Sequence, residues 1–291
     1  MQNLLQLTLL ALQIGAVYIL FALGLTLIFG VLRIVNFAHG QFFTLSALTV
    51  AVAVPALGAR GWPVWAAYLG ACAAGVLLAT LVGLVVYELG FKRVARDMTG
   101  SFILSTGLVL LMEGLLLKIF GGGVHPVPPL AEGKVELLGV GIAAQRLLLC
   151  GVAVGLMLLL TWAISGTRFG KALRAVSIDH EAAMLQGIPY RRIARRGFTI
   201  ATAIGAVAGA LIAPVAAVSP TLGDAYLVKG FIAVVIGGMG SVPGAILGSL
   251  FIAFIESFGG FYFDPSAASL AIFVLVMLVL LVRPKGLLGH G

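Results

Sequence analysis

Long apolar runs separated by short polar segments dominate the chain. Most of these runs are long enough to cross the hydrocarbon core of a bilayer, which takes about 20 residues of α-helix. The pattern therefore predicts an all-α, polytopic bundle of about seven to nine membrane segments, forming a single transmembrane domain over residues 1–291. The apolar runs cover residues 4–32, 41–57, 64–90, 101–120, 147–165, 198–218, 229–258 and 267–282.

The composition excludes an ordinary soluble domain. Hydrophobic residues make up 61% of the chain and charged residues 10%, whereas charged residues make up about a quarter of soluble domains. The two cysteines, Cys72 and Cys150, lie inside apolar runs, which favours neither a disulfide framework nor a metal cluster. The first apolar run is longer than the core of a cleaved signal peptide, so we expect it to be a mature span.

The basic residues predict which loops face the cytoplasm. The net charge is +8, and cytoplasmic loops of membrane proteins collect Lys and Arg, so a nucleic-acid partner is not needed to explain it. The loop 121–146 is poor in basic residues and rich in Gly and Pro, and we expect it outside as an irregular loop. Alternation then puts the N-terminus outside and the C-terminus in the cytoplasm. The residues that mark the inside are Arg33, Lys92, Arg93, Arg96, the basic residues of 168–196, Arg283 and Lys285.

This alternation requires the run 229–258 to begin and finish on the same side, with residues 225–228 and 260–264 both external. Its middle reads GGMGSVPG over 237–244, which suits a re-entrant loop or two half-helices surrounded by protein. The other interpretation is a packing face, because Gly240, Gly244 and Gly248 form a ladder of small residues that lets helices approach closely. Both could hold.

A second irregular stretch, RIVNFAHGQFF over 33–43, carries Asn36, His39 and Gln41 between two apolar runs. It is either an ordinary cytoplasmic turn or an unwound segment that lines a path, since polar residues at membrane depth tend to face a cavity. His39 by itself indicates neither a metal site nor a proton relay.

The sequence shows no motif that indicates enzymatic chemistry. It has no GxxxxGK[ST] loop, no His/Cys pair at metal-ligand spacing and no GxSxG elbow, so we expect no catalytic and no metal-binding residues. Glu113 and Glu256 are the candidates for ion coupling within the membrane. We interpret both as interfacial or inter-helix partners, so a transported solute would draw its energy from another protein.

A polar insert between two apolar runs, the loop 166–197, is the strongest functional signal. Asp179 can cap a helix that runs to about Gln186, and Gly187 and Pro189 end it. The basic flanks of this helix can bind anionic lipid headgroups. It is either an amphipathic helix that lies on the membrane without a partner, or a coupling helix that docks on a cytosolic ATPase.

Three segments carry a resemblance to a known family. The residues Glu181-Ala182-Ala183 followed by Gly187 resemble the EAA loop of bacterial ABC importer permeases, although the usual Ile-x-Leu-Pro ending is missing, with Arg195 and Arg196 in that region. The segments GLTLIFGVLRIVNFAHGQFFTLSA (24–47) and FIAVVIGGMGSVPGAILGS (231–249) resemble permeases of branched-chain amino acid importers of the LIV type. The similarity runs over nearly the whole chain.

The resemblance implies an inner-membrane subunit that moves solute by alternating access. It further implies a homologous second permease, two cytosolic ATPases that use the ATP, and an extracytoplasmic solute-binding protein. We expect no cofactor bound by this chain and no nucleic acid, but contact with membrane lipid. A permease for urea or short amides and an ion-coupled secondary transporter are the alternatives. The expected ATPase-coupling residues are Asp179, His180, Glu181, Ala182, Ala183 and Gly187, and the expected path residues are Asn36, His39, Gln41, Gly237, Gly238, Met239, Gly240 and Ser241.

Overall fold

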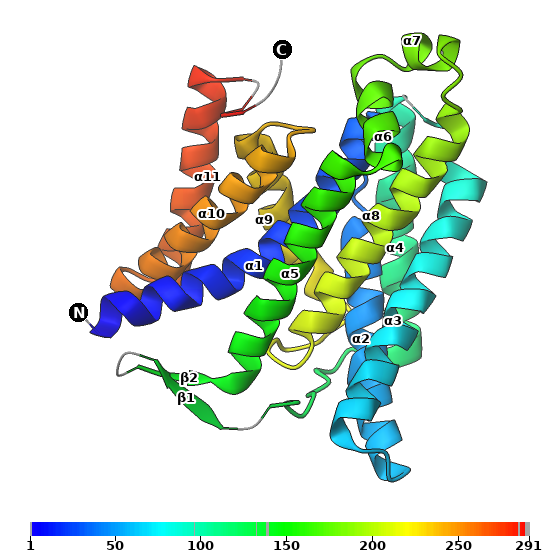
Figure 1. The fold of residues 1–291 in the computed structure, drawn as a ribbon. Helices are drawn as coiled ribbons and strands as arrows, with labels where there is room; N and C mark the ends of the chain where they lie inside the picture. Colours follow the sequence, from blue (N-terminus) through cyan, green and yellow to red (C-terminus); the bar gives the residue numbers. More distant parts are fainter. Residues whose placement is uncertain (1, 96, 132, 138–139, 285, 289–291) are drawn as a thin grey trace.

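The structure is a computed structural model that describes the chain except residues 1, 96, 132, 138–139, 285 and 289–291. The described residues form a helical bundle with one small hairpin (Figure 1). The elements are α1 (Gln2–Leu32), α2 (His39–Ala59), α3 (Val64–Val86) with a π-helical turn (Tyr87–Phe91), α4 (Met98–Phe120), β1 (Lys134–Leu137), β2 (Val140–Ala143), α5 (Ala144–Gly166), α6 (Arg168–Ile178), α7 (His180–Leu185), α8 (Tyr190–Ile212), α9 (Leu222–Gly237), α10 (Val242–Tyr262) and α11 (Pro265–Val282).

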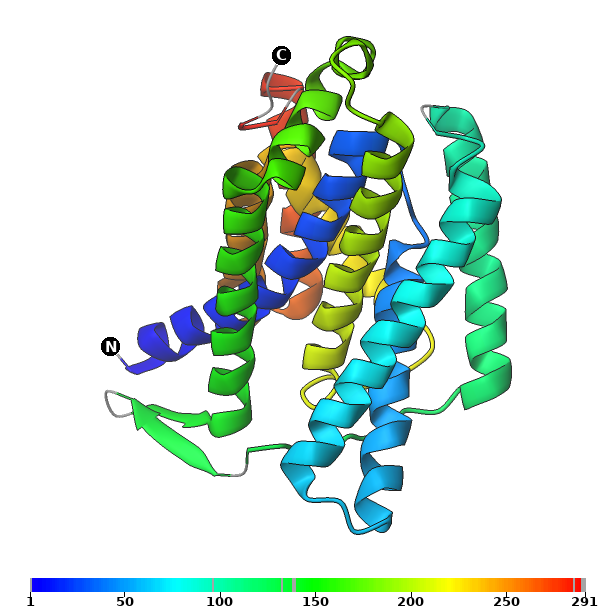
Figure 2. The same ribbon diagram turned by 45° about the vertical axis from the view of Figure 1, so that its right-hand side comes forward.

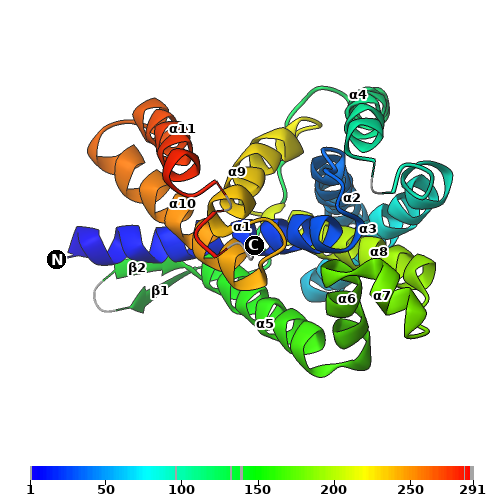
Figure 3. The ribbon, with the colours of Figure 1, turned by 90° about the horizontal axis from the view of Figure 1, so that it is seen from above.

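Eight of these helices are long and apolar enough to span a membrane, within the described part of the chain. This confirms the predicted all-α membrane bundle. Helix α1 runs through the centre, as Figure 3 shows from above, and packs against α5, α8, α9 and α10. Its most apolar stretch is 83% buried, whereas the corresponding stretches of α5 and α11 are 11% buried, so those two helices present their side chains to lipid or to other subunits.

The two ends of the bundle differ in character. Helix α7, the end of α3 and the C-terminal segment lie at one end, and the N-terminus and the hairpin lie toward the other (Figures 1 and 2). Helix α8 begins at Tyr190, eight residues before the apolar run that predicted it. The apolar run starts later because the first turns of the helix carry exposed arginines. It ends at Ile212, two residues before Pro214, which cannot continue a helix.

The loop 121–146 is more ordered than the sequence predicts. Its expected irregular structure is partly wrong, because β1 and β2 pair antiparallel with Lys134 opposite Ala143. Two hydrogen bonds hold other described parts of the loop to the bundle. The backbone N–H of His125 donates to the carbonyl of Val218 (2.8 Å), and the Gln145 Oε1 accepts from the backbone N–H of Leu130 (2.9 Å).

The run 229–258 is broken, as predicted. Gly238 (φ = +107°) and Gly240 (φ = +86°) form a turn between α9 and α10, and this turn lies at the same end of the bundle as α7 (Figure 1). The run is therefore two helices rather than one crossing. The packing interpretation also holds in part: Gly244 and Gly248 lie directly against the α9 backbone. Gly240 does not belong to that ladder, because it lies in the turn.

Candidate functional site

The expected coupling helix forms almost as the sequence predicts. Helix α7 begins after Asp179, whose Oδ1 accepts from the backbone N–H groups of Glu181 (2.9 Å) and Ala182 (3.1 Å). These bonds satisfy donors that a helix start leaves free. Gly187 ends the helix with φ = +79°, a conformation that a side chain disfavours. The short helix is thus fixed at both ends.

The expected coupling residues divide between the inner and outer faces of α7. Ala183 is buried against the bundle, and the ring of His180 packs edge-on against Tyr190, with centroids 5.8 Å apart. The Glu181 side chain is 79% exposed, and Ala182 is also exposed. Helix α7 therefore rests on α8 by one face and offers the other to its surroundings.

Three large apolar side chains on this loop are exposed as well, and sequence reasoning did not single them out. Ile178 is 79% exposed, Met184 48% and Leu185 88%. They flank Glu181 on a polar loop that connects α5 to α8, at the end of the bundle. Apolar residues at charged loop ends are a signal for protein contact. Helical spacing could have identified Met184 and Leu185 as exposed, because they point away from the face of α7 that carries the buried Ala183.

Helix α6, which the sequence did not predict as a separate helix, joins this loop to the transmembrane bundle. Thr167 caps its start by accepting from the backbone N–H of Gly170 (3.0 Å). Its last turn is held by Arg33, whose Nη2 donates to the carbonyls of Ser177 (3.2 Å) and Ile178 (3.4 Å). A cation at a helix C-terminus also complements the helix dipole. Arg33 follows the last residue of α1, so α6 and α1 are tied end to end.

The stretch after Arg33 enters the bundle without helical structure. Residues 33–38 are non-helical, and the chain returns from the α7 end to about the mid-height of the bundle before α2 begins (Figure 2). Asn36 is 2% exposed, and its two polar side-chain atoms have no hydrogen-bond partner in the described chain. The stretch is thus non-helical and partly buried within the bundle, and its place in a solute path stays a prediction.

His39, the first residue of α2, fills a notch between α1 and α8. It is fully buried, and its ring packs edge-on against Phe21, with centroids 4.9 Å apart. A Cβ atom at Gly24 would lie 2.6 Å from the His39 Nε2, and one at Gly205 would lie 2.7 Å from it. Glycine at both positions is what lets the imidazole fit. His39 is therefore a packed core residue in this conformation.

Gln41 belongs to a contact between the starts of α2 and α9. Its Nε2 donates to the Asp224 Oδ1 (3.1 Å), and the Thr44 Oγ1 accepts from the backbone N–H of Gly223 (2.8 Å). Gly40 and Gly223 bring the two backbones into direct contact. Two helices that both begin inside the bundle are thus joined at their first turns.

The second expected path segment, 237–241, lies elsewhere. Gly237 and Gly238 are buried, Met239 and Gly240 are exposed, and Ser241 caps α10 by accepting from the backbone N–H of Gly244 (3.2 Å). Its turn borders a cavity of about 320 Å³ that it shares with α1, α5 and α6. The structure does not bring this segment together with Asn36, His39 and Gln41. The turn is also held from the C-terminal side, because the backbone N–H groups of Leu287 and Leu288 donate to the carbonyls of Ile236 (2.8 Å) and Gly237 (2.9 Å).

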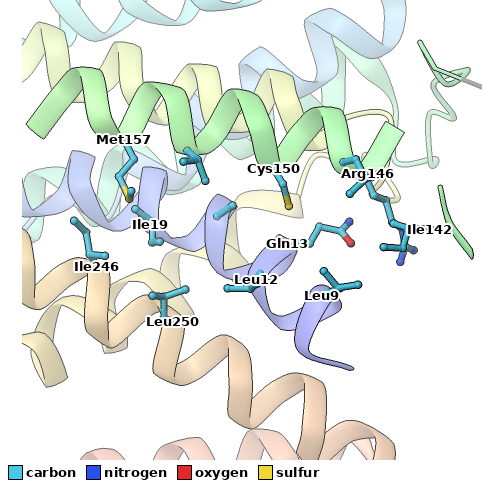
Figure 4. Close-up of a pocket in the computed structure, with 13 residues that line it drawn as sticks. Leu9, Leu12, Gln13, Ile19, Ile142, Arg146, Cys150, Met157, Ile246 and Leu250 are labelled. Carbon is cyan, nitrogen blue, oxygen red and sulfur yellow. The ribbon is translucent and has the colours of Figure 1, made fainter. Parts of the chain in front are cut away.

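Another cavity of about 320 Å³ lies between α1, α5 and α10 (Figure 4). Leu12, Ile19, Met157 and Leu250 are among the apolar side chains that line it, and Gln13 and Arg146 lie at one end. A zwitterion needs partners for both of its charges. The lining offers a cation but no carboxylate, so this cavity fits an apolar occupant better than an amino acid.

Glu256, one of the two acids considered for ion coupling, is an inter-helix partner. Its Oε2 accepts from the Tyr18 hydroxyl (2.6 Å), and its Oε1 pairs with the Lys229 ammonium. The same ammonium lies 5.7 Å from the centroid of the Tyr18 ring. The cluster joins α1, α9 and α10, and the carboxylate charge is balanced within it.

Comparison with known proteins gives matches over most of the chain. The family described as branched-chain amino acid transport system / permease component matches residues 7–282. The high-affinity branched-chain amino acid transport permease BraD of Pseudomonas aeruginosa is 30% identical over 96% of this chain and 94% of its own, and LivH of Escherichia coli K12 is 28% identical over 95% and 92%.

The autoinducer 2 import permease LsrC of an Enterobacter strain is 27% identical over 83% of this chain and 68% of its own. Among solved structures, an inward-facing ABC transporter of the metal-chelate type aligns with a TM-score of 0.52 at 16% identity, over 96% of this chain and 85% of that one. This likeness concerns the fold alone. From the family match and the relatives, the chain belongs to the permease components of branched-chain amino acid transport systems.

Proposed function

We propose that the chain is the permease subunit of an ATP-driven importer for branched-chain or related amino acids. In this proposal it pairs with a homologous second permease, two cytosolic ATPases hydrolyse the ATP, and an extracytoplasmic binding protein delivers the solute. The family match and the BraD and LivH relatives support this assignment. The chain itself is a transport subunit and binds no cofactor.

The observation that carries the proposal is the outer face of α7. Ile178, Met184 and Leu185 are exposed on a loop whose backbone is fixed by Asp179 and Gly187. A fixed backbone keeps the entropy cost of docking low, and burial of these side chains by a partner would contribute about 25 cal/mol per Å² of apolar surface. An ATPase groove that also takes up Glu181 fits both the apolar and the acidic part of this face.

The path of coupling follows from the contacts around α6. Movement of α7 shifts the C-terminal end of α6, which Arg33 ties to the end of α1. Arg33 is the first residue of the unwound segment 33–38 that leads into α2. A force applied at α7 therefore reaches the segment that contains Asn36 and the start of α2 near His39 and Gln41, which we propose to border the solute path in the open states. The turn at Gly237–Ser241 would border its cytoplasmic end.

The orientation is part of the proposal. The end of the bundle that carries α7 also carries the start of α8, whose first turns hold the arginines (Figure 1). Glu88 pairs with both Arg195 and Lys92, which places Lys92 beside these arginines. Basic residues mark the cytoplasmic side, so α7 and the C-terminus face the cytoplasm of a bacterial inner membrane. The hairpin and the N-terminus then lie toward the outside.

The test is uptake by the complete transporter in proteoliposomes. Radiolabelled leucine should accumulate only with ATP, the ATPases and the binding protein present, and excess unlabelled leucine should compete where urea does not. Competition by urea alone would favour the urea or short-amide permease. Uptake by this chain alone, driven by an ion gradient, would favour the secondary transporter and contradict the proposal. Because the chain is also similar to LsrC, an autoinducer 2 import permease, the identity of the solute is the part of the proposal that most needs this measurement.

A further inference from the structure

A groove made of three adjoining cavities lies along the outer face of α8. Three cavities, of about 550, 250 and 440 Å³, follow one another along this helix. The first two share Ile200, and the second and third share Val207. Figure 2 shows α8 lying between α5 and α3. Besides α8, a side chain of α3 lines the first cavity, side chains of α5 and α1 line the second, and side chains of both α3 and α5 line the third. The groove thus extends from the α7 end of the bundle toward the opposite end.

The two parts of the groove have different chemistry. Its α7 end is lined by Arg192, Arg195, Arg196 and Thr199. Glu88 is the acid nearby, but it pairs with Arg195 (3.2 Å) and with Lys92 (2.9 Å), so the local charge stays positive. The remainder is apolar, and the lining of the middle cavity includes Leu20, Leu156, Leu160, Ala203 and Val207.

Exposed tryptophans indicate where the membrane surface lies. Trp62 (49%) and Trp65 (63%) are exposed near one end of the bundle, and Trp162 (63%) is exposed on α5 near the other. Tryptophan gathers at the headgroup level of membrane proteins. Trp162 precedes Ala163, which lines the middle cavity together with Ile200. Because Arg196 lies one helical turn beyond Ile200, toward the α7 end, the arginines lie at the headgroup level of that leaflet.

We propose that this groove is a binding site for one anionic phospholipid of the leaflet on the α7 side. Its phosphate would bind Arg192, Arg195 and Arg196, since guanidinium groups form paired, charge-assisted hydrogen bonds to phosphate oxygens. Its acyl chains would lie along α8 between α3 and α5. This site goes beyond the transport function, and it gives the arginines that open α8 a ligand of their own.

Charge and shape together favour a lipid over other occupants. A soluble phosphate would use the arginines but not the apolar cavities that continue from Ile200 to Val207. A helix of another protein would fill the apolar part, but it would have to bring acidic groups to the arginines at the membrane surface. A phospholipid with a net negative headgroup satisfies both parts at the depth that Trp162 marks.

The experiment is native mass spectrometry of the full-length chain, with the subunits that co-purify with it, after exchange into phosphatidylglycerol or phosphatidylcholine. We expect one retained phosphatidylglycerol and little phosphatidylcholine. The double variant R192Q/R196Q should reduce this retention roughly tenfold, whereas R191Q, which changes an exposed arginine of the same helix outside the groove, should not. A203W should block the acyl chains, and L158W, at an exposed position on α5, is its matched control.

Four results would overturn the proposal. The first is equal retention of the two lipids, and the second is retention that R192Q/R196Q leaves unchanged. The third is complete displacement by soluble glycerol phosphate, which would assign the arginines to a free phosphate. Loss of a co-purifying subunit in A203W with lipid retention unchanged would likewise overturn it, because the groove would then belong to a protein contact.

Discussion

The Arg33 guanidinium lies 3.2 Å from the carbonyl oxygen of Ser177, which joins the end of α1 to the end of α6 across a long interval of sequence. Arg33 has φ = +51°, a left-handed conformation that costs a non-glycine residue about 1 kcal/mol. Because Arg33 is both strained and bonded to the proposed coupling loop, we expect it to transmit movement from that loop.

Loss of this contact should uncouple ATP hydrolysis from transport. Arg33→Asn tolerates the left-handed backbone but cannot reach α6, so the fold and ATPase association should persist while transport per ATP falls severalfold. The measurement is parallel leucine uptake and phosphate release in proteoliposomes. Arg60→Asn, in the loop after α2, is the control and should leave the ratio unchanged. An unchanged ratio in Arg33→Asn would remove Arg33 from the coupling path.

Charge on the outer face of α7 should prevent ATPase association. Leu185→Asp replaces a side chain that is 88% exposed, so the chain should still insert and fold while co-purification of the ATPases is lost. Glu181→Lys should act in the same direction. Gly187→Pro should also abolish association, because the backbone at this position has φ = +79° and proline cannot adopt it. Lys134→Glu in the hairpin is the control, and normal co-purification in all three variants would refute the docking face.

The notch around His39 predicts a non-additive effect on stability. Gly205→Ala should lower the free energy of unfolding by about 1–3 kcal/mol, because the new methyl group overlaps the imidazole. Adding His39→Ala should recover part of this loss, since the smaller side chain makes room. Thermal unfolding in detergent measures both. Gly151→Ala, where a Cβ meets no neighbour within 4 Å, is the matched control, and additive losses would show that the notch does not hold His39.

In the Tyr18–Lys229–Glu256 cluster, Lys229 and Glu256 should act as a structural ion pair. Lys229→Met leaves the carboxylate without its cation and should lower the melting temperature more than the double variant Lys229→Met/Glu256→Gln, which removes both charges. In the double variant, the residual uptake should stay independent of an imposed proton gradient. If wild-type uptake responds to that gradient and the double variant does not, Glu256 is an ion-coupling residue after all.

Cysteine labelling tests the orientation and the broken run together. With Cys72 and Cys150 replaced, single cysteines at Met239 and Ile178 should react from the cytoplasmic side, and those at Ala217 and Phe263 from the outside. All four positions lie in loops or at helix ends, and the proposed orientation predicts the side of each. Labelling of Met239 from the outside would mean that the run from α9 to α10 does not turn at the cytoplasmic surface.

The sequence predicts this fold well where local chemistry decides it. Asp179 and Gly187 define α7 to within a residue of the structure, because a cap and a left-handed glycine act over one or two turns. The break at 237–241 was predicted from the alternation of membrane crossings and from the glycines of this segment. The start of α8 was missed by hydropathy, because its first turns carry exposed arginines and only their inner face, with Ile193 and Ala194, is apolar and buried. Likewise, α6 contains several charged residues and no apolar run, so hydropathy does not predict it as a helix.

The features that the sequence left open depend on contacts between distant segments. Asn36 lies in the non-helical stretch 33–38, whereas His39 and Gln41 lie in the first turn of α2, so the predicted unwound segment is wrong for these two. Gly24, Gly205 and Gly223 make room for the start of α2 within the bundle. Pairing of Glu256 with Lys229 needs the turn between α9 and α10 to bring the two helices together. The roles of Asn36, His39, Gln41 and the turn at 237–241 in a solute path remain predictions.

The hydrogen bonds from Leu287 and Leu288 to the end of α9 bear on the order of assembly. Leu287 and Leu288 follow both α10 and α11 in the chain, so the end of α9 can accept these two bonds only after the last two helices have been synthesised. The segment that follows α11 therefore completes the end of α9, and it links the last helix of the chain to a helix made two helices earlier.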